Sequence, residues 1–349
     1  MSDEKPTTVW ADEDYVAAEN RSFLSRLYTG TGAFEIVSKR KTWYAVSALI
    51  MLICILSMVF RGFTPGIDFE GGTQVSLPAA SSSITTDSVS QVFADTLGQD
   101  PEAVQTAGAG SSATIQLRTE TMSPEDATRL AHALEDKFKP DITIADVSSS
   151  DVSSTWGAEI TRKMVIALLV FLVVVFVYIA VRFDREMSAA ALVSLLFDVV
   201  ATAGVYSLVG WEVTPAMVIG LLTVLGFSVY DTVVVFDKVE ENTRSVFATS
   251  RRTYGEQTNL AVNQTLMRSI NTTVISVLPI IALMVIAVWM LGVGTLKDLA
   301  LIQLVGVVVG TYSSVFLASP VLVSLKERRK DVKRHTAKVL ARREKVASA

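Results

Sequence analysis

The chain has 349 residues, half of them apolar, with a formal net charge of −4 and a mean hydropathy of +0.43. Its apolar residues gather in long uncharged runs, which excludes an ordinary two-domain soluble protein and indicates a membrane protein. A single cysteine and two distant histidines, His132 and His335, exclude a disulfide framework or a Cys/His metal cluster formed by this chain alone. We therefore expect no metal and no cofactor, and we expect both histidines on the solvated surface.

Six apolar runs are each long enough to cross about 30 Å of hydrocarbon at a helical rise of about 1.5 Å per residue. They cover residues 43–60, 164–181, 187–211, 213–236, 269–296 and 299–325. The first run follows a long polar leader and has no small-residue cleavage site behind it, so it is expected to remain as a helix. The predicted fold class is a polytopic α-helical membrane protein with six transmembrane helices.

Lysine and arginine in the short loops set the predicted orientation. They are frequent before the first run and after the second, fourth and sixth, whereas the turn at residues 210–214 has none and Lys297 stands alone in the last turn. Both termini are therefore expected in the cytoplasm. The predicted divisions are a cytoplasmic leader at 1–41, helix one at 42–61, an extracytoplasmic domain at 62–158, helices two to six at 159–325, and a basic cytoplasmic tail at 326–349.

The segment between the first two runs is expected to fold as a small domain. Apolar alternation predicts strands at residues 73–77, 103–107, 113–119 and 142–147, and helical spacing predicts helices at 87–98 and 123–138. Asp87 is the expected N-cap of the first helix, and Pro124 is the expected first residue of the second. The order β-α-β-β-α-β is that of the ferredoxin-like split motif.

Residues 108–113 read G-A-G-S-S-A and match the dinucleotide-binding pattern G-x-G-x-x-A. A strand-like run follows them, so no helix N-terminus would face a phosphate, and a hairpin loop is the favoured interpretation. The sequence has no G-x-x-x-x-G-K-[ST] phosphate loop, and we expect that the chain does not hydrolyse nucleotide.

Two features of the last run and the tail concern contacts with other groups. Gly306 and Gly310 form a small-xxx-small pair, which indicates close helix packing within this chain or with a partner. The basic tail at 326–345 is expected to reinforce the orientation and to contact anionic lipid. Docking of the tail to a cytoplasmic partner is the alternative.

Two aspartates inside the apolar runs are the main candidates for chemistry. A lone aspartate at the centre of a membrane helix costs about 2.5 to 3.5 kcal/mol on insertion scales, so it persists where it meets a polar partner or a water path. Asp198 lies near the middle of the third run, and Asp231 lies about 10 Å from the cytoplasmic face at helical rise. Arg268 is expected at the cytoplasmic start of the fifth helix, where its side chain can bend inward. A static interhelical hydrogen bond or ion pair and a proton-titrating site are both open interpretations.

Four motifs, in order, resemble those of the SecD/SecF protein-export family. Residues 66–73 read G-I-D-F-E-G-G-T and are similar to the family signature G-I-D-F-x-G-G-T. Residues 226–242, 269–273 and 310–314 resemble the motifs of the family's fourth, fifth and sixth helices. The single small ectodomain fits the SecF branch of the family. The signature residues are Gly66, Asp68, Gly71 and Gly72.

Two departures from the family pattern bear on these expectations. Residues 152–154 read V-S-S where members often have V-G-P before the second helix, which puts a tight turn there in doubt. Phe197 precedes Asp198 where many members have histidine, which removes a titratable neighbour and weakens a relay through Asp198.

The resemblance implies a subunit of the bacterial inner membrane that works with SecD beside the SecYEG channel. It further implies YidC, the SecA motor and unfolded secretory proteins as partners, and no nucleic acid. Members are similar to RND transporters, which use two six-span halves, so six spans here imply a partner half. The implied proton-responsive pair is Asp231 and Arg268, with Asp198 as a further relay residue.

The predicted function is that of a non-enzymatic, proton-coupled accessory subunit of protein export. Half of an RND-type small-molecule exporter is one alternative, although the ectodomain is too small for a substrate funnel. A passive assembly scaffold, in which the aspartates are only structural, is the other.

Overall fold

In the computed structural model, which describes residues 34–79, 81, 83–107, 113–286 and 294–347, six helical segments are long and apolar enough to cross a membrane. The expectation of a polytopic helical membrane protein is therefore confirmed. The last segment contains a π-helical turn, η5. The segments are α3 (Arg40–Phe60), α7 (Ser154–Arg182), α8 (Arg185–Val209), α9 (Pro215–Thr243), α10 (Tyr254–Leu283) and the series α11 (Gly294–Tyr312), η5 (Ser313–Ala318) and α12 (Ser319–Lys326).

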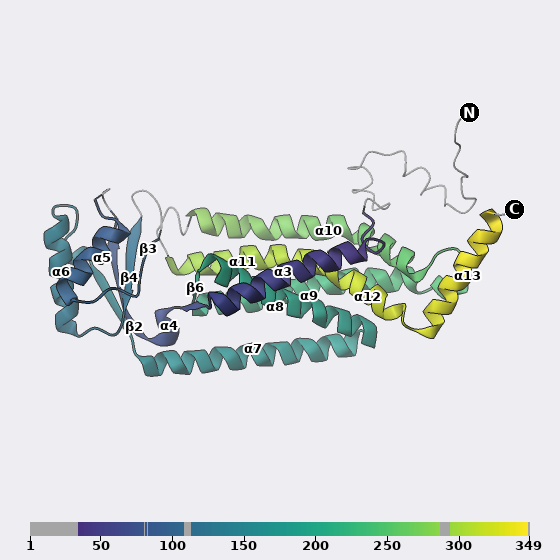
Figure 1. The fold of residues 1–349 in the computed structure, drawn as a ribbon, viewed down its shortest axis with the longest axis horizontal. Helices are drawn as coiled ribbons and strands as arrows, with labels where there is room; N and C mark the ends of the chain where they lie inside the picture. Colours follow the sequence, from purple (N-terminus) through teal and green to yellow (C-terminus); the bar gives the residue numbers. More distant parts are fainter. Residues whose placement is uncertain (1–33, 80, 82, 108–112, 287–293, 348–349) are drawn as a thin grey trace, which may run out of the picture.

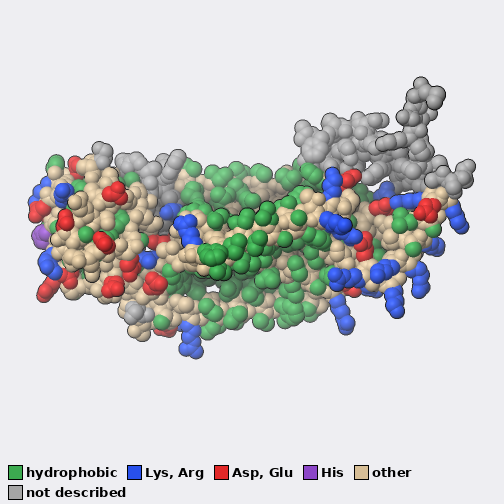
Figure 2. Space-filling view, viewed as in Figure 1, with side chains coloured by type: hydrophobic (Ala, Val, Ile, Leu, Met, Phe, Trp, Pro, Cys, Tyr) green, Lys and Arg blue, Asp and Glu red, His purple; other side chains and the backbone are tan. Residues whose placement is uncertain are grey.

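The membrane helices divide into a central and a peripheral group. Within their most apolar windows, 50% of the residues of α8 and 44% of those of α9 and of the α11–α12 span are buried. The corresponding shares are only 11% for α3, 6% for α7 and 11% for α10. Figure 1 shows α7 and α10 on opposite sides of the bundle with the central helices between them. Hydrophobic side chains form a band across the middle of the molecule, whereas charged side chains gather at its two ends (Figure 2).

Glycines allow α9 and α11 to pack closely. A Cβ atom placed on Gly306 would collide with the side chain of Val224, and one placed on Gly310 would lie 2.8 Å from the Cβ of Ser228. Both glycines therefore face α9 of the same chain. The close helix packing expected from the small-xxx-small pair is confirmed, and it lies within this chain.

A four-stranded antiparallel sheet forms the core of the segment between α3 and α7. Its strand order is β3-β4-β2-β5, and α5 and α6 cover the face that points away from the membrane helices (Figure 1). Leu77, Phe93, Leu117 and Leu130 are buried between the sheet and these helices. The elements are β2 (Gly72–Pro78), α5 (Thr86–Leu97), β3 (Ala103–Ala107), β4 (Thr114–Thr119), α6 (Pro124–Phe138) and β5 (Ser148–Val152).

Two details of this unit differ from the sequence predictions. The N-cap of α5 is Thr85 and not Asp87, because Thr85 and Ser88 form a reciprocal capping box. The predicted last strand at 142–147 is wrong: Ile142 lies in the core and residues 144–146 form a short 3-10 helix, η2 (Ile144–Asp146). The strand that completes the sheet is the serine-rich β5, whose residues are mostly exposed, so no apolar alternation marks it.

The predicted hairpin loop at 108–113 lies outside the described residues except for Ala113. The strands on either side of it, β3 and β4, pair as antiparallel neighbours. At the entry to α7, the side chain of Ser153 accepts a hydrogen bond from the backbone nitrogen of Trp156 and caps the helix.

A compact junction joins the sheet to the membrane helices. The short strand β1 (Thr64–Pro65) pairs in parallel with β6 (Glu212–Val213), which lies in the turn between α8 and α9. Arg118 of β4, whose side chain is only 10% exposed, forms an ion pair with Glu212 at 3.6 Å and with Glu102 at 3.2 Å, and donates to the carbonyl of Pro65. The guanidinium therefore ties the sheet to the rim of the helix bundle.

The tail forms a helix, α13 (Lys330–Ala347), that folds back over the loop between α9 and α10. Its His335 is 7% exposed, packs edge-on against Phe247 and lies 2.8 Å from the carbonyl of Thr249. The expectation of a solvated His335 is wrong, because α13 covers this loop. His132 is exposed, as expected.

Candidate functional site

Asp231 lies at the meeting point of three membrane segments. It belongs to α9 and is 3% exposed. Ser269 of α10 donates a hydrogen bond of 2.8 Å to one carboxylate oxygen, and Ser314 of η5 donates to the other. A hydroxyl pair, Thr273 and Thr311, joins α10 to α11 nearby at 2.7 Å. The motifs at 269–273 and 310–314 thus supply the groups that hold Asp231.

Asp198 occupies a second, separate polar site on α8. It is 1% exposed, accepts a hydrogen bond from Ser228 of α9, and lies within hydrogen-bonding reach of Ser313. Its other oxygen, Oδ1, has no hydrogen-bond partner among the described residues. Neither this carboxyl nor that of Asp231 forms an ion pair within the part of the chain that the structure describes.

The π-helical segment η5 connects the two carboxyl groups. Ser313 faces Asp198 and the next residue, Ser314, faces Asp231. A π-helical turn is rare and occurs often at functional sites, because it re-aims side chains within an otherwise regular helix. The adjacent serines therefore link two sites that sequence patterns present as independent.

Arg268 forms no hydrogen bond or ion pair with Asp231 among the described residues, although it lies near enough to interact with that carboxyl electrostatically, and it is not at a helix start. Helix α10 begins at Tyr254, where Thr253 and Glu256 form a capping box, so Arg268 lies within the helix. Its side chain is exposed and donates to the hydroxyl of Tyr230 at 3.2 Å. The expected position at the cytoplasmic start of the helix is wrong, since the polar residues 254–268 continue the helix beyond the apolar run.

Three of the serines that hold the aspartates, Ser269, Ser313 and Ser314, were not singled out by the sequence reasoning, although they lie within the quoted motifs. Ser228, Ser269, Ser313 and Ser314 are each at most 1% exposed. Serine is common in helices and carries no charge, so hydropathy does not single it out. The available signal was the position of each serine within one of the quoted motifs.

The signature residues lie at the far end of the bundle from Asp231. Gly66 donates its backbone N–H to the carbonyl of Val213 at 2.8 Å and precedes the short helix α4 (Ile67–Glu70). Gly72 has φ +126°, and a Cβ there would lie 2.5 Å from the carbonyl of Thr119, so the position requires glycine. Asp68 is half-buried, and burial raises the pKa of its carboxyl above the usual range. Gly71 ends α4 with φ +84°. The signature thus builds the junction between the sheet and the bundle.

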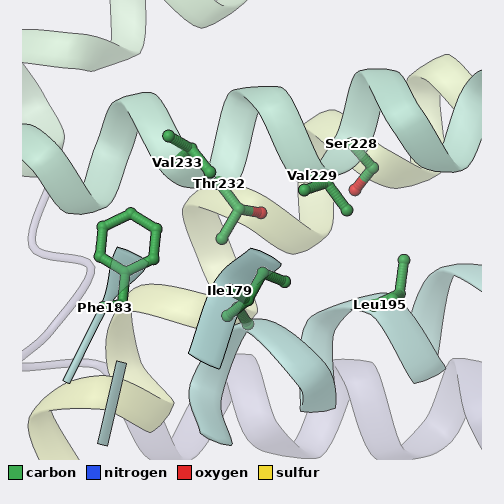
Figure 3. A pocket seen from close by; sticks show the side chains of 8 residues that line it. Ile179, Phe183, Leu195, Ser228, Val229, Thr232 and Val233 are labelled. Carbon is green, nitrogen blue, oxygen red and sulfur yellow. The ribbon is translucent and has the colours of Figure 1, made fainter. Parts of the chain in front are cut away.

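A small crevice between α7, α8 and α9 lies beside Ser228. Figure 3 shows Ser228 and Thr232 on the α9 side, opposite Ile179 of α7, Phe183 directly after the end of α7, and Leu195 of α8. Most of its lining is apolar, and its polar groups are the two hydroxyls of α9. The crevice therefore approaches the Asp198 site from one side of the bundle.

The fold and the site define a polytopic helical membrane protein that buries ionisable groups among its central helices. Such groups are expensive within a membrane and mark ion or proton pathways when they are present. Among the described residues, no group of three or more His, Cys, Asp or Glu side chains could hold a metal ion.

Comparisons with known proteins identify the family. Residues 131–328 match the family described as protein export membrane protein SecD/SecF, C-terminal, and residues 56–82 match the SecD/SecF GG motif. The chain is 58% identical to protein translocase subunit SecF of Mycobacterium tuberculosis, over 93% of this chain and 74% of that one. It is 38% identical to the same subunit of Streptomyces coelicolor, over 91% of this chain and 84% of that one.

A solved structure agrees with these matches. The crystal structure of SecDF from Thermus thermophilus, described as a translocon-associated membrane protein, superposes with a TM-score of 0.72 at 29% identity. The match covers 84% of this chain and 39% of that one. The chain belongs to the SecD/SecF family of protein-export membrane proteins, and the resemblance read from its motifs is confirmed.

Proposed function

We propose that the chain is an accessory subunit of the Sec protein-export machinery that works with SecD and uses the proton gradient to promote late translocation of secreted proteins. The names of its SecF relatives support the export role. Its work is mechanical and not enzymatic, and it uses no cofactor and no nucleic acid.

The observation that carries the proton role is the environment of Asp231. Its carboxyl is buried, and its hydrogen-bond partners among the described residues are two hydroxyls, from Ser269 and Ser314. A hydroxyl can donate to a carboxylate or accept from a carboxylic acid, so the same partners serve both protonation states. An unpaired buried charge is costly, so movement of Arg268 toward or away from this carboxyl would change its proton occupancy. One charge that crosses 100 mV supplies about 2.3 kcal/mol, which is enough to bias a two-state helix arrangement.

The test is Asp231→Asn, which keeps the size of the side chain and removes its titration. We expect this variant to insert normally and to lose the part of export that depends on the proton gradient. Arg268→Met is expected to behave alike, and Asp198→Asn is expected to be milder. The measurement is secretion of a reporter protein with and without an uncoupler, at matched amounts of membrane-inserted protein. Wild-type export by Asp231→Asn would favour the scaffold, and loss of drug resistance without loss of export would favour the small-molecule exporter.

The partner half, SecD, is proposed to cover the face formed by α9 and α10. Thr223, Gly226 and Tyr230 recur at helical spacing on the exposed side of α9, and Arg268 is exposed beside them. An arginine that faces lipid within a span is costly, whereas a polar partner surface would satisfy it. The longer SecDF chain that includes a match to this one is consistent with such a partner.

Disulfide cross-linking tests this surface. Thr223→Cys should cross-link to cysteines on SecD. Val173→Cys is the matched control, because Val173 is 61% exposed on α7, and α7 lies across the bundle from α10 in Figure 1. Equal cross-linking from both positions would argue against a defined partner face on α9.

Both termini are proposed to lie in the cytoplasm of a bacterium, with the chain in the inner membrane. Lysine and arginine side chains gather at the end of the molecule that carries α13 (Figure 2), and cytoplasmic loops are the basic ones in membrane proteins. Reporter fusions after Ser150 and after Ala349 should indicate opposite sides of the membrane. Signals from the same side would contradict this topology.

The unit at residues 72–152 is proposed to be a ferredoxin-like domain outside the cytoplasm that captures the emerging chain. The sheet order β3-β4-β2-β5, with α5 and α6 on one face, supports the fold. The isolated segment should give the circular dichroism of a folded α+β domain, and a random-coil spectrum would contradict its independence. Cross-linking to a secretory protein during translocation tests its role as a receiver.

The remaining proposed partners are the SecYEG channel, YidC, the SecA motor and anionic lipid. The lipid contact rests on α13, whose Lys333, Arg334 and Lys338 are exposed, because basic amphipathic helices bind anionic membrane surfaces. Co-purification with the channel from gently solubilised membranes tests the export partners. Flotation with vesicles that contain or lack phosphatidylglycerol tests the lipid contact.

A further inference from the structure

A row of buried polar side chains runs along one face of α8. Ser194, Asp198, Thr202 and Tyr206 recur every fourth residue, so they share one side of the helix. Each is at most 1% exposed. Ser194 Oγ, Asp198 Oδ1 and Thr202 Oγ1 have no hydrogen-bond partner among the described residues. A buried polar atom without a partner costs about 1 to 3 kcal/mol, so three in a row require an explanation.

Internal water explains them. Positions four residues apart on a helix are separated by about 6 Å along its axis, which is too far for a direct hydrogen bond. Two hydrogen bonds of about 2.8 Å in sequence span that gap, so one water molecule between Ser194 and Asp198 and another between Asp198 and Thr202 would satisfy the three atoms that lack partners. Buried waters of this kind typically satisfy polar groups that lack protein partners.

The outer end of the row reaches an acidic mouth. The hydroxyl of Tyr206 donates to the backbone oxygen of Asp298 at 2.9 Å, and Thr214 donates to the carboxylate of the same residue at 3.1 Å. Asp68 and Glu212 lie close enough to Asp298 to interact with it electrostatically. These three carboxyl groups form the acidic mouth, and two bases adjoin them, since Arg118 pairs with Glu212 at 3.6 Å and Lys297 interacts with Asp298. The remaining excess of negative charge raises the local concentration of cations such as hydronium. Asp68 of the signature motif is therefore one of the carboxyl groups at this entrance.

The inner end of the row reaches both candidate aspartates. Asp198 is itself a member of the row, and Ser313 and Ser314 connect its surroundings to Asp231. Ser228, which donates to Asp198, also lines the crevice in Figure 3. The row thus spans the distance from the outer rim of the bundle to its central polar site.

We propose that this face of α8 is a single-file hydrated path that carries protons from the acidic mouth, past Tyr206 and Thr202, to Asp198 and then through the serine pair to Asp231. At each step one O–H bond forms and one breaks. Reorientation of the water and hydroxyl groups then returns the hydrogen-bonded chain to its starting state. No other reactant takes part. The path rests on the proposed use of the proton gradient, and it assigns Thr202, Tyr206 and Ser194 roles as positioning residues for water.

Accessibility to silver ions tests the hydration directly in the full chain. The native Cys54 is first replaced by alanine, and single cysteines are then placed at Thr202, Ser194 and Ala201 in membrane vesicles. Ala201 is the matched control, because it is adjacent to Thr202 and 1% exposed but packs in an apolar cluster with Phe197 and Leu317. We expect silver to block later maleimide labelling several-fold faster at 202 and 194 than at 201. Equal rates at the three positions would overturn the path.

A hydroxyl deletion tests whether protons use the path. Thr202→Val keeps the shape of the side chain and should lose most gradient-dependent export, and Thr202→Ser should restore it. Thr161→Val is the control, since Thr161 is an exposed residue of α7 whose hydroxyl bonds to its own helix. Wild-type export by Thr202→Val would overturn the path. If Asp231→Asn keeps gradient-dependent export, the proposed function fails. The silver experiment decides separately whether water fills this face of α8.

Discussion

The central membrane helices and the peripheral helix α10 are similar in hydropathy but differ in how much they bury. Helices α8 and α9 both have a mean hydropathy of 2.0 in their most apolar windows, and α10 has 2.1. The most apolar of all, α7, reaches 3.3 and is the least buried. Hydrophobicity therefore locates spans but does not say which of them form the working core. The residues that do so are buried serines, threonines and aspartates.

The difference follows from the solvent. Lipid tails are as apolar as leucine, so no hydrophobic force drives apolar helix faces together within a membrane. Close packing and interhelical hydrogen bonds must hold the central helices instead. In this chain the close packing is provided by Gly306 and Gly310, and the hydrogen bonds by the hydroxyls around Asp198 and Asp231.

The largest expected effect comes from filling the central interface. Gly306→Leu would drive a side chain into Val224, and overpacking of this kind costs about 3 kcal/mol or more when the neighbour is a helix that cannot move. We expect the variant to be degraded in cells. The measurement is the amount of full-length protein in the membrane.

The matched control is Gly226→Leu on α9. A Cβ at Gly226 meets no atom within 4 Å in this chain, so the variant should accumulate normally. It lies on the proposed partner face and should instead weaken co-purification with SecD. If Gly226→Leu were lost from the membrane while Gly306→Leu accumulated normally, Gly226 and not Gly306 would lie in the packed interface.

Much of this architecture was readable from the sequence, for physical reasons. Long apolar runs identified the spans because only helices of that length satisfy the backbone within hydrocarbon. Proline at the first turn and an apolar stripe placed α6 correctly, and the glycine pair indicated close packing of α11 without identifying α9 as its neighbour. The edge strand β5 escaped prediction because an exposed serine-rich strand has no apolar period.

The candidate site was readable only in part. A charge inside an apolar run is conspicuous, which singled out Asp198 and Asp231. Their partners depend on which faces of α9, α10 and η5 meet, and no periodicity in one helix reports that. The extension of α10 to Tyr254 also moved Arg268 into the helix, where it contacts Tyr230 and not Asp231.

A smaller effect is expected from the hydroxyls that hold Asp231. Ser269→Ala and Ser314→Ala each remove one hydrogen-bond donor to the buried carboxyl of Asp231. A carboxyl oxygen left without its hydrogen bond costs about 1 to 3 kcal/mol. Each single variant should lower gradient-dependent export in part, and the double variant should approach Asp231→Asn. Secretion of a reporter at matched protein levels measures this. If the double variant keeps clearly more gradient-dependent export than Asp231→Asn, the two serines do not act together through Asp231.

A still smaller effect is expected at the junction outside the bundle. Arg118→Gln removes the ion pairs to Glu212 and Glu102 while it keeps much of the side-chain volume. The glutamates are partly exposed and hence screened, so the loss should be about 1 to 2 kcal/mol. Hydrogen exchange should rise in β1 and β4 and stay unchanged in α9. Unchanged exchange in β1 would mean that the β1–β6 pairing alone holds the junction.

The sharpest test of the two groups compares two isoleucines on the same peripheral helix, and the exposed one of the pair has the smallest expected effect. Ile179 of α7 is 1% exposed and packs into the central cluster, whereas Ile166 is 49% exposed. Ile179→Ala should leave a cavity and lower the free energy of unfolding by about 2 kcal/mol. Ile166→Ala should cost less than about 0.5 kcal/mol, because lipid replaces the lost contacts in both folded and unfolded states. Reversible unfolding in mixed micelles measures both values. Equal losses would contradict the division of α7 into a buried face at Ile179 and a lipid-facing surface at Ile166.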